Sequence, residues 1–411
     1  MKILVLSNLY PPHAIGGYEE RCRQIVDLLR ERGHEVRVLT STHGVGREVR
    51  EEHVHRRLRI HGFFGHPWLG IARLYGLERH NHAVLRAELA DFQPDLVHVW
   101  NLGGLSKTLM LTLQAARRPV VYDVSDHWIA RSLRADVWLN WWNGVAGGPA
   151  AKLLRGLLRA TGLAAAIRRR APYAHWSELR FDRIYFCSDA LKQLTLARDW
   201  PLAHAAVIFC GVETAKFARR PPSDRFTRLL WVGRLNDDKD PLTAVHALGR
   251  LAAAGDRPLR LDLYGKGDDA YVAALHRAVA EAGLTDRVTF QSASAAAMKG
   301  VYAGYDALLF TSAWAEPFAL TPLEAMAARL PVISTLAGGS AELVRHGENA
   351  LAFRTGDAAD LAAQVRRLAD EPALRQTLAA TAGREVEARF DLQVITTHIE
   401  TYLRESLAHH G

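Results

Sequence analysis

Two carboxylates frame one short loop that leads into a predicted helix and could bind an anion such as a phosphate. The loop reads Glu316-Pro-Phe-Ala-Leu-Thr-Pro-Leu-Glu324 and lies between a predicted strand over 306–312 and a predicted helix that begins near Thr321. Unpaired N–H groups at the start of a helix, with the positive end of its dipole, bind anions such as phosphates. With a nucleotide diphosphate bound there, Glu316 would face the group beyond the phosphates and Glu324 would accept hydrogen bonds from ribose. The alternative is a solvated Glu316 and a Glu324 that merely suits the first helical turn.

A second loop adds two cations. It reads Trp231-Val-Gly-Arg-Leu-Asn-Asp-Asp-Lys-Asp-Pro241, and a predicted strand ends at its glycine. Arg234 and Lys239 follow on the same loop, where two cations can clamp a diphosphate leaving group. Asp238 and Asp240 formally match an Asp-x-Asp metal motif. Because Lys239 stands between them, a local charge network explains the pattern better, and we predict no metal site.

The N-terminal half contributes a glycine pair and a histidine. Gly16 and Gly17 join the first predicted strand to the first predicted helix. Such a pair lets the backbone approach a ligand closely, and the helix start behind it favours an anion, although a plain flexible turn has the same pattern. His127 follows a predicted strand over 120–124, at the sheet edge where α/β proteins bind ligands. A structural role and a functional role both fit this histidine.

Strand and helix patterns alternate along the chain, which predicts βαβ units and mostly parallel sheets. At 411 residues the chain is too long for one core. We therefore predict two doubly wound domains, 1–204 and 205–385, with the ligand in the cleft between them, followed by a helical segment over 386–411. The predicted strands are 2–8, 34–41, 58–64, 95–100, 120–124, 183–188, 206–211, 228–233, 260–265, 288–291, 307–311, 331–335 and 350–353. The predicted helices are 18–31, 71–91, 105–116, 240–253, 270–283, 294–303, 321–329 and 358–371.

The composition argues against several classes of protein. Apolar residues make up 49% and charged residues 23% of the chain, as in an ordinary soluble enzyme. Cys22, Cys187 and Cys210 lack the spacing of a zinc site or a disulfide framework, which fits a reducing compartment. No apolar run approaches the roughly 20 residues of a membrane span, and the N-terminus reads as a strand and not as a signal peptide. The net charge of +8 favours anionic partners without choosing among them.

One segment, 128–176, departs from the alternation. Leucines at 153, 154, 157, 158 and 163 run beside basic residues at 152, 155, 159 and 168–170. This pattern predicts a basic amphipathic helix, which is a type of helix that binds anionic membrane surfaces. The alternative is an excursion that packs on its domain with its arginines in water.

Together these motifs resemble the retaining family 4 glycosyltransferases of GT-B fold, in the family's order and over nearly the whole chain. The resemblance implies an α/β protein with two Rossmann-like doubly wound domains facing across a cleft. It further implies a nucleotide-sugar donor held mainly by the second domain and a final helix, within 386–411, that packs back on the first. The motifs that carry it are Gly16-Gly17, Asp126-His127, Gly233-Arg-Leu with Lys239, and Glu316 to Glu324 followed by Ala325-Met-Ala and Pro331-Val-Ile.

The resemblance also implies residue roles. Glu316 would hold sugar hydroxyls and the developing oxocarbenium charge, and His127 would contact the donor sugar; these two are the predicted catalytic residues. Glu324 would bind the ribose. The residues expected at the diphosphate are Arg234 and Lys239, the backbone of Phe318, Ala319, Leu320 and Thr321, and Gly16 and Gly17 from the first domain.

The predicted function is the retaining, metal-independent transfer of a sugar, expected to be a hexose, from a UDP- or GDP-sugar to a hydroxyl group. In such enzymes the acceptor hydroxyl attacks from the front face and passes its proton to the leaving phosphate. The acceptor is a glycan, a lipid-linked sugar or a small molecule, and we expect it on the N-terminal domain. The tryptophans over 128–142 are the candidate surface for it, and a place in the core is an equally good interpretation of these residues. No cofactor and no nucleic-acid partner are expected. The expected location is the cytoplasm, and attachment to the inner face of the membrane stays open.

Two other functions stay open. One is a nucleotide-sugar epimerase of GT-B fold, and the other is a non-catalytic nucleotide-sugar-binding protein associated with a membrane. Three positions also depart from the family's usual glycines, namely Ala319, Asp240 and the stretch Phe290-Gln-Ser292. These departures bear on the donor base and sugar more than on the reaction class.

Overall fold

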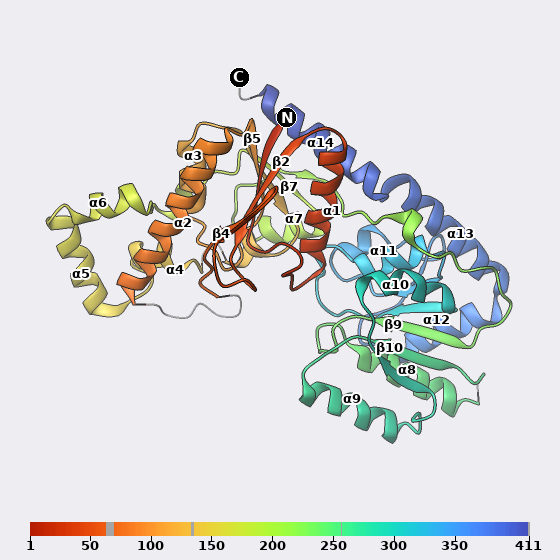
Figure 1. Cartoon of the computed structure of the whole chain (residues 1–411). Coiled ribbons are helices and arrows are strands. Elements are labelled where there is room, and N and C mark those ends of the chain that lie inside the picture. The colour runs from red at the N-terminus through yellow and green to blue at the C-terminus, as the bar shows by residue number, and fades with distance from the viewer. Residues whose placement is uncertain (63–69, 133–134, 256, 410–411) are drawn as a thin grey trace. The chain divides into compact units, whose positions relative to one another are not determined.

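The structure is a computed structural model that describes residues 1–62, 70–132, 135–255 and 257–409. The chain divides into two compact units (Figure 1). The N-terminal unit comprises Met1–Cys187, Lys192–Ile208 and Thr396–Gly411, and the C-terminal unit comprises Ser188–Leu191 and Phe209–Ile395. The predicted strand over 58–64 lies partly outside the described residues.

The N-terminal unit is built on one sheet of the order β3-β4-β2-β1-β5-β6-β7-β8. All neighbouring strands are parallel except the pair β3 and β4. The central strands are buried on both faces, which agrees with their continuous apolar sequences. The strands are β1 (Lys2–Ser7), β2 (Glu35–Ser41), β3 (Val49–Glu51), β4 (Val54–Leu58), β5 (Leu96–Asn101), β6 (Val120–Val124), β7 (Arg183–Phe186) and β8 (Ala206–Val207).

Helices cover this sheet, and the end of the chain contributes one of them. Glu400 Oε1 lies 3.0 Å from His34 Nε2 beside β2, and the Tyr402 hydroxyl donates to the Ile184 carbonyl of β7 at 3.0 Å. Helix α14 (Leu392–Ala408) therefore belongs to the N-terminal unit from Thr396 onward. The helices are α1 (Gly17–Glu31), α2 (Ile71–Phe92), α3 (Leu109–Ala115), α4 (Val137–Trp142), α5 (Gly148–Ala160), α6 (Leu163–Arg170), α7 (Asp189–Leu196) and α14 (Leu392–Ala408).

The segment over 128–176 forms a small subsidiary core beneath α5 and α6. Trp138, Trp141 and Trp142 are buried, and the Trp142 ring stacks on the Tyr173 ring with 3.7 Å between centroids. The tryptophans are therefore core residues and not the exposed acceptor surface that the sequence suggested. Within the described residues, no helix combines the length and apolarity that crossing a membrane requires.

The C-terminal unit repeats the architecture with a parallel sheet of the order β11-β10-β9-β12-β13-β14. The predicted α/β class with parallel sheets is thus confirmed in both units. The strands are β9 (Arg228–Val232), β10 (Arg260–Tyr264), β11 (Val288–Gln291), β12 (Ala307–Phe310), β13 (Val332–Ser334) and β14 (Leu351–Ala352). The helices are α8 (Pro241–Ala253), α9 (Asp269–Glu281), α10 (Ala295–Val301), α11 (Leu320–Ala327), α12 (Ala358–Asp370) and α13 (Pro372–Arg389).

Candidate active site

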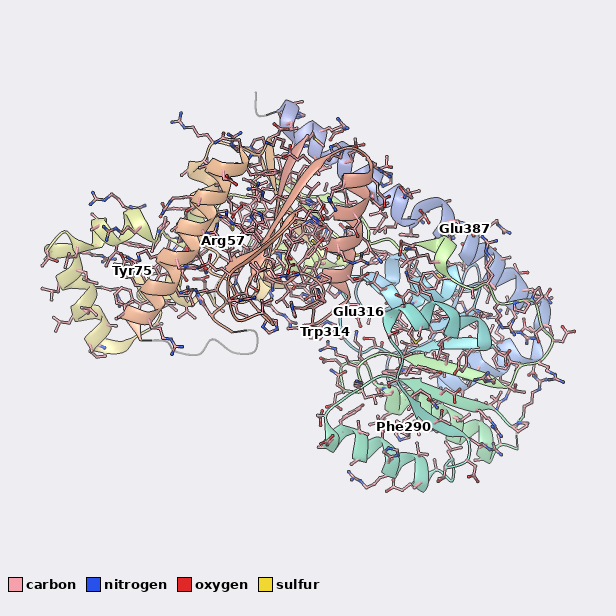
Figure 2. All side chains as sticks on the ribbon, in the orientation of Figure 1. Arg57, Tyr75, Phe290, Trp314, Glu316 and Glu387 are labelled. Atoms are coloured by element: carbon pink, nitrogen blue, oxygen red, sulfur yellow. The ribbon has the colours of Figure 1, made fainter. Side chains whose placement is uncertain are left out.

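Lys239 and Glu316 form an ion pair at the carboxyl edge of the C-terminal sheet. Glu316 lies on the loop from β12 to α11 (Figure 2), and Lys239 lies on the loop from β9 to α8. The Ser312 hydroxyl donates to Glu316 Oε1 at 2.7 Å, and the Thr311 hydroxyl donates to the Lys239 carbonyl at 2.9 Å. Because β9 and β12 are neighbours, their loops meet, and the two predicted groups are in direct contact.

The backbone of Glu316 is held from a third side by a glycine pair that the sequence reasoning missed. Gly339 N–H donates to the Glu316 carbonyl at 2.8 Å. Gly338 has a φ of +62°, and a Cβ atom there would lie 2.5 Å from the backbone N and O of Glu316. Only glycine allows both this conformation and this approach. Two adjacent glycines just after the predicted strand over 331–335 were the available signal.

The loop after Glu316 leads into α11, which begins at Leu320. No side chain among the described residues caps this helix, so the N–H groups of Leu320 and Thr321, which precede Pro322, are available to an anion. Ala319 occupies the N-cap position with a φ of −87°, a conformation that alanine adopts without strain. The absence of the family's usual glycine at Ala319 therefore costs nothing in this conformation.

Phe318 fixes the same loop to the body of the unit. It is buried, and its ring packs against Phe209 and Phe390, with 5.7 Å and 5.9 Å between the ring centroids. The position of the α11 start is thus set by apolar packing as well as by the sheet.

Glu324 lies one turn into α11 and is half-buried. The Tyr302 hydroxyl donates to Glu324 Oε2 at 2.5 Å. Burial raises the pKa of the Glu324 carboxyl, while the bond from Tyr302 and the charge of Lys299 oppose that rise. Oε1 accepts no hydrogen bond from the described residues, which leaves an acceptor for a ligand hydroxyl. Tyr302 is a second residue that the sequence reasoning missed.

The loop from β9 to α8 differs from the expectation in one respect. Lys239 pairs with Glu316, and its neighbours Asp238 and Asp240 do not form the expected network with it. Asp240 instead caps α8, where its Oδ1 accepts the Thr243 N–H at 3.1 Å, and it has a left-handed φ of 45°. This left-handed conformation explains why the family usually has glycine at this position. Aspartate also tolerates the conformation.

Arg234 is exposed just beyond the end of β9 and forms no ion pair with the residues that the structure describes. Its guanidinium is therefore available to a ligand. Within residues 1–62, 70–132, 135–255 and 257–409, no group of three or more His, Cys, Asp and Glu side chains could hold a metal ion.

In the N-terminal unit, Gly16 and Gly17 begin α1. Both are exposed, and the Gly16 N–H donates to the Glu19 carboxylate at 2.9 Å. Burial raises the pKa of the Glu19 carboxyl. One N–H of the predicted anion site is therefore already engaged by Glu19.

His127 follows β6 beside a polar group at the carboxyl edge of the N-terminal sheet. Its neighbour Asp126 accepts Asn101 Nδ2–H at 2.6 Å and the Trp128 N–H at 2.7 Å, and burial raises the pKa of the Asp126 carboxyl. The Asn8 N–H donates to the Asn101 carbonyl at 2.9 Å. The two asparagines, each at a strand end, were not singled out from the sequence.

The structure therefore gathers the predicted residues in two groups. Lys239 contacts Glu316, and Glu324 lies on the helix that follows Glu316, all within the C-terminal unit together with Arg234. Gly16, Gly17 and His127 lie in the N-terminal unit, at the carboxyl edge of its sheet.

Comparisons with known proteins identify the family of the chain. Glycosyltransferase Family 4 matches residues 15–216, and Glycosyl transferases group 1 matches residues 213–385. A glycogen synthase of Mycobacterium tuberculosis is 28% identical over 426 aligned positions, which cover 97% of this chain and 93% of that protein.

Two solved structures resemble the whole chain. HepE of Anabaena in complex with UDP has a TM-score of 0.70 and 22% identity, covering 98% of this chain and 100% of that one. Sucrose-phosphate synthase of Thermosynechococcus elongatus has a TM-score of 0.69 and 20% identity, covering 99% of each chain. These neighbours confirm the GT-B fold. With consecutive family matches over 15–385, the chain belongs to the family 4 glycosyltransferases of the group 1 type and is an enzyme.

Proposed function

We propose that the enzyme transfers a hexose, with retention, from a UDP- or GDP-sugar to a hydroxyl acceptor. The observation that carries this proposal is the ion pair of Lys239 and Glu316 beside the uncapped start of α11. A cation, a carboxylate and the N–H groups of a helix start lie together. The cation and the N–H groups suit a diphosphate, and the carboxylate suits the hydroxyls of the sugar attached to it. HepE has been solved with UDP and with UDP-glucose, which supports a donor of that class.

In the proposed complex, each of these residues binds a different part of the donor. Lys239 and exposed Arg234 bind the diphosphate together with the N–H groups of the first turn of α11. Glu324 accepts hydrogen bonds from the ribose. Glu316 binds sugar hydroxyls and stabilises the positive charge that develops on the sugar. His127 contacts the donor sugar, and Gly16 and Gly17 contribute backbone groups from the N-terminal unit.

The reaction then needs no further reagent. The bond from the anomeric carbon to the phosphate oxygen breaks, and a bond to the acceptor oxygen forms on the same face of the sugar. The acceptor proton passes to the departing phosphate. Because Arg234, Lys239 and the helix dipole stabilise the leaving diphosphate, we propose that transfer proceeds without a metal ion.

The acceptor proposed is a glycan presented at an anionic membrane surface. The relative named glycogen synthase supports a glycan hydroxyl. On the hairpin of α5 and α6 (Figure 1), Leu153 is 78% exposed, Leu157 59% and Leu163 54%, beside the exposed basic run at 168–170. No acidic residue occurs between Asp136 and Glu178. Exposed leucines among uncompensated cations suit peripheral binding to acidic lipid headgroups.

The activity is tested by incubating the enzyme with UDP- and GDP-hexoses and analysing the products. Glu316→Ala and Lys239→Ala should each lower transfer and donor hydrolysis by about 100-fold or more, as expected when electrostatic stabilisation is removed. Lys216→Ala, an exposed lysine of the same unit, is the control and should keep full activity. Full activity in both site variants would refute the assignment.

Two further readouts separate the alternatives. An epimerase would convert the nucleotide sugar without releasing the nucleotide, and a non-catalytic binding protein would bind the donor and leave it unchanged. Activity should persist in excess EDTA if no metal takes part. Loss in EDTA with recovery on adding Mg²⁺ or Mn²⁺ would contradict metal independence.

A further inference from the structure

A cavity of about 310 Å³ lies in the C-terminal unit, away from the candidate active site. Pro331 lines it and directly precedes β13, so the cavity is at the amino edge of the sheet, whereas Lys239 and Glu316 follow carboxyl ends of strands. The walls come from the loop over 219–223, the turn after α11 and helix α13. The cavity therefore lies at the opposite edge of the sheet from the residues proposed to bind the donor.

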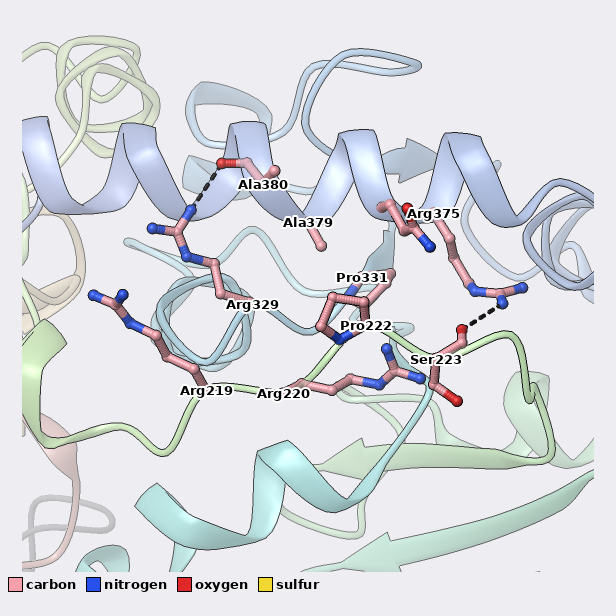
Figure 3. A pocket seen from close by; sticks show the side chains of 10 residues that line it. Arg219, Arg220, Pro222, Ser223, Arg329, Pro331, Arg375, Ala379 and Ala380 are labelled. Carbon is pink, nitrogen blue, oxygen red and sulfur yellow. Dashed lines mark hydrogen bonds between the residues drawn. The ribbon is translucent and has the colours of Figure 1, made fainter.

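Four arginines converge on the cavity. In Figure 3, Arg219 and Arg329 lie to one side of two prolines, and Arg220 and Arg375 lie to the other. Arg219 and Arg329 share a single carboxylate oxygen, Glu387 Oε1, at 2.9 Å and 2.8 Å. Two guanidinium groups therefore have one carboxylate between them.

The second pair is also short of negative charge. Arg220 Nη2 donates to Asp306 Oδ1 at 2.6 Å, while Asp306 Oδ2 accepts the N–H groups of Thr227 and Arg228 at 2.7 Å and 2.8 Å. Asp306 therefore accepts three hydrogen bonds, two of them from backbone N–H groups, and Arg220 is its ion-pair partner.

Arg375 is the most unusual of the four. It is 2% exposed, and its guanidinium donates to backbone carbonyls, including Leu368 O at 2.6 Å and Ser223 O at 2.9 Å. No carboxylate in the described part of the chain forms an ion pair with it. Burial lowers the pKa of Arg375, and the charge of Arg220 lowers it further. The charges of Asp306 and Asp224 act on Arg375 in the opposite direction. Four guanidinium groups at the cavity thus outnumber the carboxylates of Glu387, Asp306 and Asp224, and this excess of positive charge suits an anionic ligand.

We propose that this cavity binds a small organic anion with a phosphate group. Guanidinium groups match the geometry of phosphate oxygens and bind them through paired hydrogen bonds. Arg219 is 64% exposed at the rim and makes one side-chain hydrogen bond with the residues that the structure describes, so most of its donors are available. Pro222 and Pro331 provide apolar walls for the organic part, and the volume lies at the small end of the range for ligand pockets, about 300–1,000 Å³.

The experiment uses inorganic phosphate and glycerol 3-phosphate as probes, titrated into the whole enzyme at constant ionic strength by calorimetry. Saturable binding is expected for wild type, with glycerol 3-phosphate binding more tightly. Arg219→Gln should weaken that binding at least fivefold, and the double variant Arg219→Gln/Arg329→Gln should abolish it. Because Arg219 is exposed, its replacement should leave the fold intact, which a melting curve checks.

Two matched variants make the outcome decisive. Arg384→Gln removes an exposed arginine of α13 outside the cavity and should leave the affinity unchanged. Lys239→Ala removes a cation of the candidate donor site and should leave the affinity of the cavity for glycerol 3-phosphate unchanged, whatever phosphate the donor site itself binds. Absence of saturable binding, or equal weakening in Arg384→Gln, would overturn the proposal. Loss of binding in Lys239→Ala with retention in Arg219→Gln would overturn it too, because the phosphate would then occupy the donor site.

Discussion

The hydroxyl of Tyr302 donates a 2.5 Å hydrogen bond to Oε2 of Glu324, the carboxylate assigned to the donor ribose. The bond fixes the side chain while Oε1 remains open. Tyr302→Phe should therefore raise the KM for the donor severalfold and leave kcat nearly unchanged. The free energy of unfolding should decrease by about 1.5 kcal/mol, which is the lower end of the range for losing a hydrogen bond to a charged group. Donor titration and denaturant unfolding measure the two effects, and a KM equal to that of wild type would contradict the role of Glu324.

The pKa of Glu324 predicts a pH dependence with a definite sign. Burial raises this pKa above its ordinary value of 4.5, so the folded state holds the proton up to a higher pH than the unfolded chain. The ionised group costs stability at neutral pH, and the free energy of unfolding should rise as the pH falls through the folded pKa toward 4.5. Donor affinity should fall over the same interval, because the ribose needs an acceptor. In Glu324→Gln, the free energy of unfolding and the donor affinity should both depend less on pH. If both depended on pH as in wild type, Glu324 would be excluded as the cause.

The close approach of Gly338 to Glu316 predicts a strong effect of one methyl group. Gly338→Ala should lower kcat/KM by about 100-fold, since a displacement of about 1 Å at a reacting group has that cost. Gly347→Ala is the matched control, because Gly347 also has a positive φ, +79°, but has no atom within 4 Å of an added Cβ. Both variants carry the left-handed strain, so a specific loss of activity in Gly338→Ala reports the contact. Equal activities would remove Gly338 from the site.

Asp240 predicts a separable effect on stability. Asp240→Ala loses the cap of α8 and keeps the left-handed backbone, so unfolding should require about 1–2 kcal/mol less. Asp240→Gly relaxes the backbone and should cost less than Asp240→Ala, and Asp240→Asn, which can still cap, should be nearly neutral. Chemical denaturation of the three variants measures this order. If Asp240→Ala were as stable as wild type, the cap would have no energetic role.

The hairpin of α5 and α6 predicts binding to anionic vesicles. Wild type should sediment with vesicles of phosphatidylglycerol and not with vesicles of phosphatidylcholine alone. Replacing Arg168, Arg169 and Arg170 by Gln should reduce that binding roughly 100-fold, given about 1 kcal/mol for each basic residue near such a surface. Leu153→Ser should weaken it as well, whereas Leu336→Ser, an exposed leucine of the C-terminal unit, should not. Unchanged sedimentation of the arginine variant would refute the membrane proposal.

The sequence predicted the fold through periodicity but predicted contacts only in part. Alternating patterns placed Arg234 and Lys239 after one strand and Glu316 after another. The order of the sheet, which brings β9 beside β12, is a long-range property that those patterns do not contain. For that reason Lys239 was expected to interact with Asp238 and Asp240, its neighbours in sequence, and its contact with Glu316 appeared only in the structure.

Other limits have equally specific causes. The strand predicted over 206–211 is reduced to Ala206–Val207, because β8 is at the edge of its sheet and pairs with β7 alone. The need for glycine at position 338 depends on the distance to Glu316, which lies 22 residues earlier. Composition also could not decide whether the tryptophans over 128–142 are core or surface, since aromatic rings suit both places.

The stack of Trp142 on Tyr173 gives the protein a built-in optical reporter. Three of the ten tryptophans of the chain, Trp138, Trp141 and Trp142, share the apolar core under α5 and α6. Their emission should be shifted to short wavelength, and its intensity and polarisation should respond when the hairpin changes its packing. The difference in emission between wild type and Trp142→Phe can therefore follow this segment during titration with vesicles, donor or acceptor.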